Sequence, residues 1–247
     1  MDKNTGKERD YSVTFEIKVY ENDWEYLLKG DSLAKIISRC NYNFKNKILF
    51  INNVNDVNLV KKFADKKIEE GIIDRYYVVE DFSNETLNYF DIQKESFYGG
   101  YYYSISELVS IYLCETDYLL HFSSDSYLEE SQINWIDEAI GIFQEREDII
   151  VANPTWNFAY HEAKKESVSE IGNFYLGYGF SDQCYLVRTD VFKKKIYNES
   201  NLESERYPKY GGELFEKRVD SYMRNHEKYR ITSKVISYVH ENFPKKG

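Results

Sequence analysis

The 247-residue chain has little of several features that would define its class at once. Its three cysteines, Cys40, Cys114 and Cys184, are odd in number and far apart in sequence. They exclude a disulfide framework and a clustered-cysteine zinc site, and they favour a reducing, cytoplasmic location. No apolar run approaches the roughly 20 residues of a transmembrane segment, and the start lacks the apolar stretch of a signal peptide. An excess of basic residues is also missing: 32 against 42 acidic ones give −10, so we expect no nucleic-acid partner.

Four motifs typical of common enzyme classes are absent as well. The chain has no G-x-x-x-x-G-K-[ST] loop, no G-x-G-x-x-G after its first expected strand, no H-E-x-x-H and no G-x-S-x-G. Phosphate-loop NTPases, dinucleotide-dependent dehydrogenases, zincins and α/β-hydrolases therefore lose support. What the chain does have is aromatic bulk, 17% of its residues, which excludes a disordered chain.

Hydrophobic periodicity predicts alternating strands and helices over the first 150 residues. Residues 13–19 alternate apolar and polar side chains, which predicts a strand with one buried face, whereas the continuous apolar run at 48–51 predicts a strand covered on both faces. Further strands are expected at 76–79, 118–122 and 149–152, and helices at 33–40, 59–70, 105–113 and 133–143. This order is typical of an α/β domain with a parallel sheet and helices on its faces.

The second half of the chain has a weaker pattern. We expect irregular, aromatic-rich segments at 82–103 and 155–180, a strand at 183–188, a helix at about 213–225 and a last strand at 230–239. Residues 1–11 are polar and are expected to be flexible. No low-complexity linker divides the remainder, so we expect a single domain over 12–247, with an α/β half at 12–126 and a more irregular half at 127–247.

The sharpest local feature is the sequence Ser-Ser-Asp-Ser at 123–126, directly after the expected strand at 118–122. In open α/β sheets, ligands bind beyond the carboxyl ends of the strands. Asp125 can hold a hard divalent cation there, with diphosphate oxygens completing the coordination shell. The alternative is a capping box, in which Ser126 and Glu129 cap a following helix and Asp125 adds favourable charge. The spacing leaves both interpretations open, and they do not exclude each other.

Other polar residues stand at expected strand ends or helix starts, and each also has an ordinary structural explanation. The Asn and Asp side chains at 52–56 can bind a nucleobase or ribose, but they are equally good turn formers, and Asp81 has the same ambiguity. Glu213 and Glu216 follow two glycines at a helix start, where a carboxylate can be a general base or simply favour the helix N-terminus. His240, at the end of the last strand, can be a ligand or a structural histidine.

The order of these sequences is more informative than any one of them. The first four expected strands end in Tyr-Glu-Asn-Asp (20–23), Asn-Asn-Val-Asn-Asp (52–56), Glu-Asp (80–81) and Ser-Ser-Asp-Ser (123–126), and Gly-Gly-Glu-Leu-Phe-Glu-Lys-Arg follows later (211–218). From about residue 12 to 240, the chain resembles a GT-A-fold glycosyltransferase of the family-2 type. The resemblance implies a single-domain α/β/α sandwich with a central, mostly parallel mixed sheet, a nucleotide-binding half and an acceptor-binding half.

The resemblance also implies roles for individual residues. Nucleotide contacts fall on Tyr20, Asn22, Asn53, Asp56, Asp81 and Ser124. A divalent cation, Mn²⁺ or Mg²⁺, would be held by Asp125 and His240, and the catalytic base would be Glu213, with Glu216 second. The chain departs from the family pattern at Asn53, where members often have Asp, and at Ser123, where the first Asp of an Asp-x-Asp motif is usual.

The activity implied is a metal-assisted, inverting transfer of a sugar from a nucleotide-sugar donor, by default a UDP-sugar, to a glycan or another hydroxyl acceptor. A different class of function stays open: a catalytically silent GT-A-like domain that binds a glycan or a protein. The serine at 123 and the aromatic residues at 97–103 support this alternative. A nucleotidyltransferase is a third and weaker hypothesis, because the phosphate loop expected after the first strand is missing.

Overall fold

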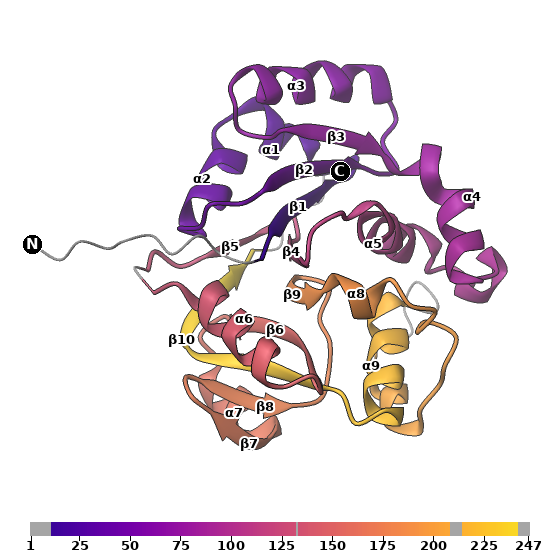
Figure 1. Ribbon diagram of the computed structural model, residues 1–247. Coiled ribbons are helices and arrows are strands. Elements are labelled where there is room, and N and C mark those ends of the chain that lie inside the picture. Colours follow the sequence, from indigo (N-terminus) through magenta and orange to yellow (C-terminus); the bar gives the residue numbers. More distant parts are fainter. Residues whose placement is uncertain (1–10, 132, 208–213, 242–247) are drawn as a thin grey trace, which may run out of the picture.

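The computed structural model describes residues 11–131, 133–207 and 214–241 of the chain, and its centre is a ten-stranded mixed sheet (Figure 1). The parallel half contains β1 (Val13–Val19), β2 (Asn46–Ile51), β3 (Arg75–Val78) and β4 (Tyr118–Phe122). The other half contains β5 (Ser126–Leu128), β6 (Ile149–Trp156), β7 (Ser167–Ile171), β8 (Phe174–Gly177), β9 (Cys184–Arg188) and β10 (Tyr229–His240). The order is β3-β2-β1-β4-β9-β6-β10-β8-β7, with β5 paired to β10.

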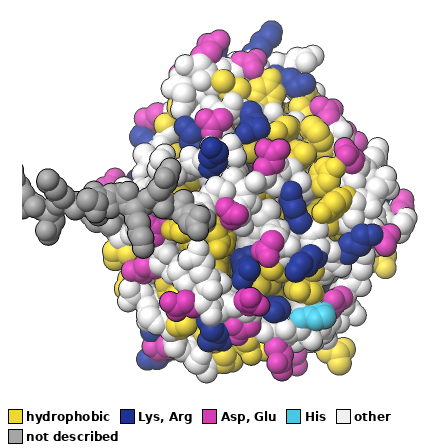
Figure 2. Space-filling view, viewed as in Figure 1, with side chains coloured by type: hydrophobic (Ala, Val, Ile, Leu, Met, Phe, Trp, Pro, Cys, Tyr) yellow, Lys and Arg dark blue, Asp and Glu magenta, His cyan; other side chains and the backbone are white. Residues whose placement is uncertain are grey.

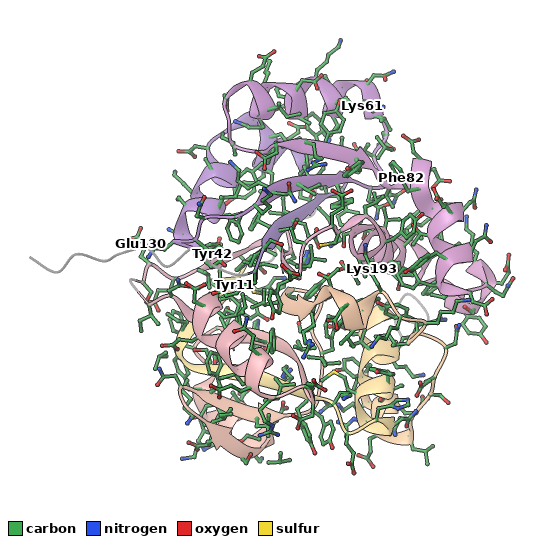
Figure 3. The ribbon with its side chains drawn as sticks, in the orientation of Figure 1. Tyr11, Tyr42, Lys61, Phe82, Glu130 and Lys193 are labelled. Carbon is green, nitrogen blue, oxygen red and sulfur yellow. The ribbon has the colours of Figure 1, made fainter. Side chains whose placement is uncertain are left out.

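Helices cover both faces of this sheet, as expected for an α/β/α sandwich. One face packs against α1 (Trp24–Lys29), α2 (Ser32–Arg39), α3 (Val57–Glu69) and α6 (Trp135–Glu145). The other face packs against α4 (Val79–Phe90), α5 (Tyr101–Leu113), α8 (Thr189–Phe192) and α9 (Phe215–Asn225). Phe82 of α4, labelled in Figure 3, meets the Tyr77 ring of β3 edge-on at 5.4 Å. The expected single domain with a parallel core in a mixed sheet is therefore confirmed, whereas its division at residue 126 stays a prediction.

Strand β1 corrects the expectation of one exposed face. The strand itself has the expected bounds, but every one of its residues is buried. Phe15 and Ile17 belong to the core beneath α1 and α2, and Glu16 and Lys18 point to the opposite face, where α5 covers them. The alternation of apolar and polar residues therefore separates two buried environments.

Two segments expected to be irregular contain regular structure. In 82–103, α4 continues to Phe90, a short 3₁₀ helix η1 (Lys94–Phe97) follows, and α5 begins at Tyr101. In 155–180, helix α7 (Tyr160–Glu166) is followed by the β7–β8 hairpin, which is bound to the sheet through β8 and β10. Leu87 and Phe90 bury the inner side of α4, so packing stabilises a helix whose sequence pattern is weak.

The capping-box interpretation of Ser126 is wrong. Ser126 begins β5, an antiparallel strand that pairs with the end of β10, and α6 begins only at Trp135. The N-cap of α6 is Asn134, whose side chain accepts a hydrogen bond from the backbone N–H of Asp137 at 3.2 Å. Asp125 is therefore free of any helix-capping role.

On the face drawn in Figure 2, acidic and basic side chains are interspersed. Among the residues that the structure describes, no helix combines the length and apolar character needed to cross a membrane. A last 3₁₀ helix, η2 (Leu202–Arg206), packs against α9.

Candidate functional site

A pocket of about 340 Å³ lies where β1 and β4 end at the same edge of the sheet. Because β9 runs antiparallel to β4, its beginning reaches this edge too, as does the end of β10. The pocket is lined by Lys18, Tyr20, Tyr103, Glu107, His121, Ser123, Ser124, Asp125, Asp182, Gln183 and His240. This position, beyond the carboxyl ends of parallel strands, is the usual ligand position in open α/β sheets.

The two residues expected to hold a metal lie together in this pocket. His240 Nε2 is 3.1 Å from Asp125 Oδ2, and both side chains are partly exposed. Ser123 donates a hydrogen bond to Asp125 Oδ1 at 2.9 Å, so the serine that replaces the usual acidic residue orients the remaining one. The backbone of His240 is fixed by Asn157 Oδ1, which accepts its N–H at 2.9 Å. The structure thus brings together a carboxylate from the turn between β4 and β5 and an imidazole from the end of β10, which are far apart in sequence.

The floor of the pocket is a buried charge cluster formed by Glu16, Lys18, Glu107 and His121. Lys18 Nζ lies 2.5 Å from Glu16 Oε1, 3.0 Å from Glu107 Oε2 and 3.0 Å from His121 Nδ1. Tyr185 donates a further hydrogen bond to Glu107, and its ring packs against that of His121 in a tilted arrangement, with centroids 4.8 Å apart. The ammonium group therefore contacts Glu16, Glu107 and His121 at once, whereas the second oxygen of Glu16, Oε2, has no hydrogen-bond partner among the described residues.

This cluster keeps Glu16 charged. Burial by itself raises the pKa of Glu16, but the interactions with His121 and Lys18 outweigh it and lower that pKa to about 2. Glu16, Glu107 and His121 have the ligand types and spacing of a metal site. Because Lys18 already supplies the positive charge at their centre, we interpret the cluster as a structural ion network and not as the metal centre.

A second pair of ionisable groups, Asp182 and Glu216, has raised pKa values, whereas the pKa of Glu16 is lowered. The backbone N–H of Asp182 donates to Glu216 Oε1 at 3.0 Å, which holds the start of α9 against the segment before β9. Burial raises the pKa of Asp182 to about 6, and the carboxylate of Glu107 adds to the effect. Burial and the proximity of Asp182 likewise raise the pKa of Glu216 well above its usual value. Two buried carboxyl groups beside each other favour the protonated form, and here the effect of burial outweighs that of the nearby Lys18 and His121.

Asp23 is a third carboxylate at this edge. It accepts a hydrogen bond from the Ser124 hydroxyl at 2.5 Å and from the backbone N–H of Tyr20 at 2.6 Å. Burial nevertheless raises its pKa to about 6. Asp23 thereby ties the end of β1 to the end of β4 beneath the pocket.

The residues predicted to bind the nucleotide are placed in two groups. Tyr20 and Ser124 line the pocket, and the Tyr20 hydroxyl is within 2.8 Å of Ser106 Oγ. Four others are exposed and do not line it: Asn22, Asn53, Asp56 and Asp81. Asp56 is the N-cap of α3, where its carboxylate accepts the Leu59 N–H at 2.9 Å, and Asp81 lies in the first turn of α4 instead of at a strand end. Both therefore have structural explanations, and their nucleotide role stays a prediction.

Of the two predicted catalytic glutamates, Glu213 lies outside the described residues, and Glu216 contacts Asp182 without lining the pocket. Pattern analysis also missed several lining residues: Lys18, Tyr103, Glu107, His121, Asp182 and Gln183. A signal for some of them exists in the sequence. Glu107 is an acidic residue in an otherwise uncharged helix, and His121 interrupts an apolar strand.

Comparison with known proteins gives a clear result only for solved structures; no family model and no curated protein matches the chain. GalNAc-T7 with UDP, GalNAc and Mn²⁺ matches at a TM-score of 0.56 and 10% identity, over 93% of this chain and 44% of that one. Glucosyl-3-phosphoglycerate synthase from Mycobacterium tuberculosis, in complex with Mn²⁺, UDP and glucosyl-3-phosphoglycerate, matches at 0.50 and 10% identity, over 95% of this chain and 74% of that one. A mycobacterial protein matches at 0.51 and 12% identity, over 95% and 69%.

The chain has the GT-A fold. At these identities the likeness concerns the fold alone, and each bound molecule belongs to the protein in which it was seen. The expected resemblance is confirmed at that level. Within the GT-A fold of this chain, the pocket at the ends of β1 and β4 and the Asp125–His240 contact form the candidate site.

Proposed function

We propose that the chain is a glycosyltransferase that moves a sugar from a nucleotide-sugar donor to the hydroxyl group of a glycan or another acceptor. The observation that carries the proposal is the contact between Asp125 and His240 at a pocket formed by the carboxyl ends of β1 and β4. Two proteins of the same fold are described in complex with UDP and Mn²⁺, which supports a UDP-sugar as the default donor.

The side chains at this point suit a divalent cation. Asp125 offers a carboxylate oxygen and His240 an imidazole nitrogen, 3.1 Å apart. Neighbouring ligands of an octahedral ion with bonds of 2.0–2.2 Å are separated by about 3 Å. Both side chains are partly exposed, so the pair is accessible from the pocket, whereas the side chains of Lys18 and Glu16 are almost fully buried beneath it. When bound, Mn²⁺ or Mg²⁺ would offset the charge that develops on the leaving diphosphate.

The remaining roles are proposed from the resemblance together with the positions of those side chains that the structure describes. Tyr20 and Ser124 line the pocket where the nucleotide would lie, and the exposed Asn22, Asn53, Asp56 and Asp81 are proposed as its outer contacts. Glu213 is proposed to take the proton from the acceptor hydroxyl in a single, inverting displacement. Asp182 lines the pocket and Glu216 does not, so Glu216 would act through its contact with Asp182.

A catalytically silent domain that binds a glycan or a protein is the alternative. Ser123 in place of an acidic residue favours it, as do the exposed aromatic side chains Tyr98, Tyr102 and Tyr103, of which Tyr103 lines the pocket. The two hypotheses differ in one property that is simple to measure. A transferase needs the donor nucleotide, whereas a silent domain does not.

We also propose a cytoplasmic location. The cysteines Cys40, Cys114 and Cys184 are free and buried. Burial raises the pKa of Cys40 and Cys184, which keeps them as uncharged thiols. Unpaired cysteines are typical of proteins in reducing compartments.

The test is UDP binding with and without Mn²⁺, measured by thermal shift and calorimetry. A ligand that binds only the native state at 100 times its dissociation constant adds about 2.7 kcal/mol, which a thermal shift detects. We expect Mn²⁺ to strengthen UDP binding to the wild type, and Asp125→Asn and His240→Gln to remove the Mn²⁺ effect with little change in melting temperature. The amide oxygen introduced by Asp125→Asn can still accept the hydrogen bond from Ser123, so this variant separates metal binding from folding.

His226→Gln is the matched control, because His226 is an exposed histidine that pairs with Glu199. It should leave the Mn²⁺ effect intact. Full Mn²⁺ dependence in both site variants would contradict the metal site. A wild type that binds neither UDP nor a nucleotide sugar would favour the silent domain.

A further inference from the structure

A second pocket, of about 330 Å³, lies next to the first one. It is formed by the end of β6, by α7 and by β10. Gln183 lines both pockets and therefore separates them. Its side chain is held in this position by Tyr238, whose hydroxyl donates to Gln183 Oε1 at 3.1 Å.

We propose that this second pocket binds a neutral hexopyranose unit as the sugar acceptor, an inference that rests on the proposed glycosyl transfer. Three features of the pocket carry it: an exposed tryptophan, an incompletely paired arginine and an acidic charge balance.

Trp156 is the first feature. Of the three tryptophans in the chain, Trp24 and Trp135 are 5% and 1% exposed, whereas Trp156 is 45% exposed at the end of β6. An indole presents a flat apolar face together with one N–H donor. The face of a pyranose ring that carries axial C–H groups is apolar in the same way, while its hydroxyls point outward to polar partners. Trp156 thus offers a stacking surface at the pocket wall.

Arg230 is the second feature. Its ion pair with Glu166 is loose, at 3.8 Å, and its buried Nε has no hydrogen-bond partner among the described residues. Buried donors without partners are rare in proteins. Gly179, at φ +106°, lets the guanidinium lie close to the backbone, since a Cβ there would be 3.3 Å from Arg230 Nη1 and 2.9 Å from Arg206 Nη2. Arg230 lines the pocket, and its terminal N–H groups have, among the described residues, only the loose contact with Glu166, so these groups can donate hydrogen bonds to a ligand, whereas the buried Nε does not reach it.

The charge balance is the third feature, and it selects the class of ligand. Among the residues that the structure describes, the charged side chains lining the pocket are Glu162, Glu166 and Arg230, which together carry −1, while Arg206 lies behind Arg230 at Gly179 and does not line the pocket. A phosphorylated or carboxylated ligand would be repelled by the two glutamates. Carboxylates, an amide and a guanidinium together accept and donate hydrogen bonds in the pattern that adjacent sugar hydroxyls require. A neutral sugar satisfies all three features.

The experiment uses the emission of Trp156, because the two buried tryptophans are shielded from solvent. Acrylamide quenching is measured for the whole chain with maltotriose, cellotriose or N-acetylchitotriose, and with glucose 6-phosphate as the anionic comparison. Sugars are titrated to about 10 mM, at which a site with a 1 mM dissociation constant is ~90% filled. We expect at least one neutral trisaccharide to protect Trp156 saturably, and we expect Trp156→Phe to lose the response.

Arg230→Gln should weaken this protection at least tenfold, whereas Arg146→Gln, a change at an exposed arginine paired with Asp148, should not. Absence of saturable protection by all three trisaccharides overturns the inference, as does tighter binding of glucose 6-phosphate. UDP binding is measured on the same samples. Protection of Trp156 without UDP binding would contradict the proposed function but support the sugar site. UDP binding without protection would support the proposed function and contradict the sugar site.

Discussion

Two groups of ionisable side chains lie at the same pocket, the Lys18 cluster and the Asp182–Glu216 pair. Both are buried, but the pKa of Glu16 in the first is lowered and the pKa of Asp182 in the second is raised. In the Lys18 cluster, an ammonium and an imidazole stand between carboxylates, and the pKa of Glu16 falls to about 2. In the Asp182–Glu216 pair, carboxyl groups stand beside each other and the pKa of Asp182 rises to about 6. Burial raises the pKa in both places. The neighbouring charges decide the outcome: at Glu16 the interactions with His121 and Lys18 outweigh burial, whereas at Asp182 the carboxylate of Glu107 adds to it.

The difference also separates two functions within the proposed site. A network whose charges compensate each other fixes the end of β1 against β4 and α5, and gives the pocket a rigid floor. A carboxyl pair that shares a proton can exchange it near neutral pH. Because Asp182 lines the pocket, this pair is placed where a proton from a bound molecule could be received.

The largest effect is expected from Lys18→Met. The change leaves Glu16 and Glu107 buried without their cation, and removing one partner of a buried ion pair typically costs about 3–5 kcal/mol. Chemical denaturation would measure the loss. The stability from the charged Glu16 is present above pH 4.5 and is lost as the pH falls through about 2, so wild type and variant should converge in strong acid.

The control for Lys18→Met is the double variant with Glu16→Gln, which removes one of the two stranded charges. It should recover a substantial part of the lost stability, because the cost comes from uncompensated charge and not from the missing methylene contacts. A double variant as unstable as Lys18→Met alone would show that the cluster matters through packing.

Asp182→Asn is expected to increase the free energy of unfolding, by less than Lys18→Met decreases it. The native state binds a proton on Asp182 that the unfolded chain releases between pH 3.8 and about 6, so this group makes folding less favourable as the pH rises. The variant should match the wild type near pH 4 and be more stable at pH 7, by on the order of 1–2 kcal/mol after allowance for partial solvent access.

Melting temperatures across this range test the prediction for Asp182, at about 2–4 °C per kcal/mol for a chain of this size. Asp190→Asn, at an exposed carboxylate beside Arg188, is the control and should show no such trend. A variant less stable than the wild type at pH 7 would mean that Asp182 is held in its charged form, and the contrast with Glu16 would disappear.

The contrast between these two groups also shows what the sequence could reveal. Strands β1 and β4 and helix α2 were predictable because their apolar periods are strong and local. The Lys18 cluster was not, since alternation in β1 looks the same whether the second face meets water or meets Glu107, 89 residues away. The strand-end rule did anticipate that Asp125 and His240 share one edge of the sheet. Helix α4 was missed because tertiary packing stabilises it more than its own pattern does.

The smallest change in stability is expected at Asp56, an exposed carboxylate that belongs to neither group. Asp56 caps helix α3 and is also a predicted nucleotide contact. Asp56→Ala removes the acceptor for the Leu59 N–H at the start of α3 and should cost about 1 kcal/mol. Asp56→Asn should preserve stability, because Asn caps a helix about as well as Asp.

UDP affinity, compared between the two variants by calorimetry, then separates the capping role of Asp56 from a nucleotide contact. If Asp56 only caps α3, both variants bind UDP like the wild type once folded. If its charge contacts the nucleotide, Asp56→Asn weakens binding at unchanged stability, and Asn53→Ala, at the neighbouring exposed residue with φ of 50°, should weaken it as well. Unchanged affinity in all three variants would remove this loop from the nucleotide site and leave Tyr20, Asn22, Asp81 and Ser124 as its predicted contacts.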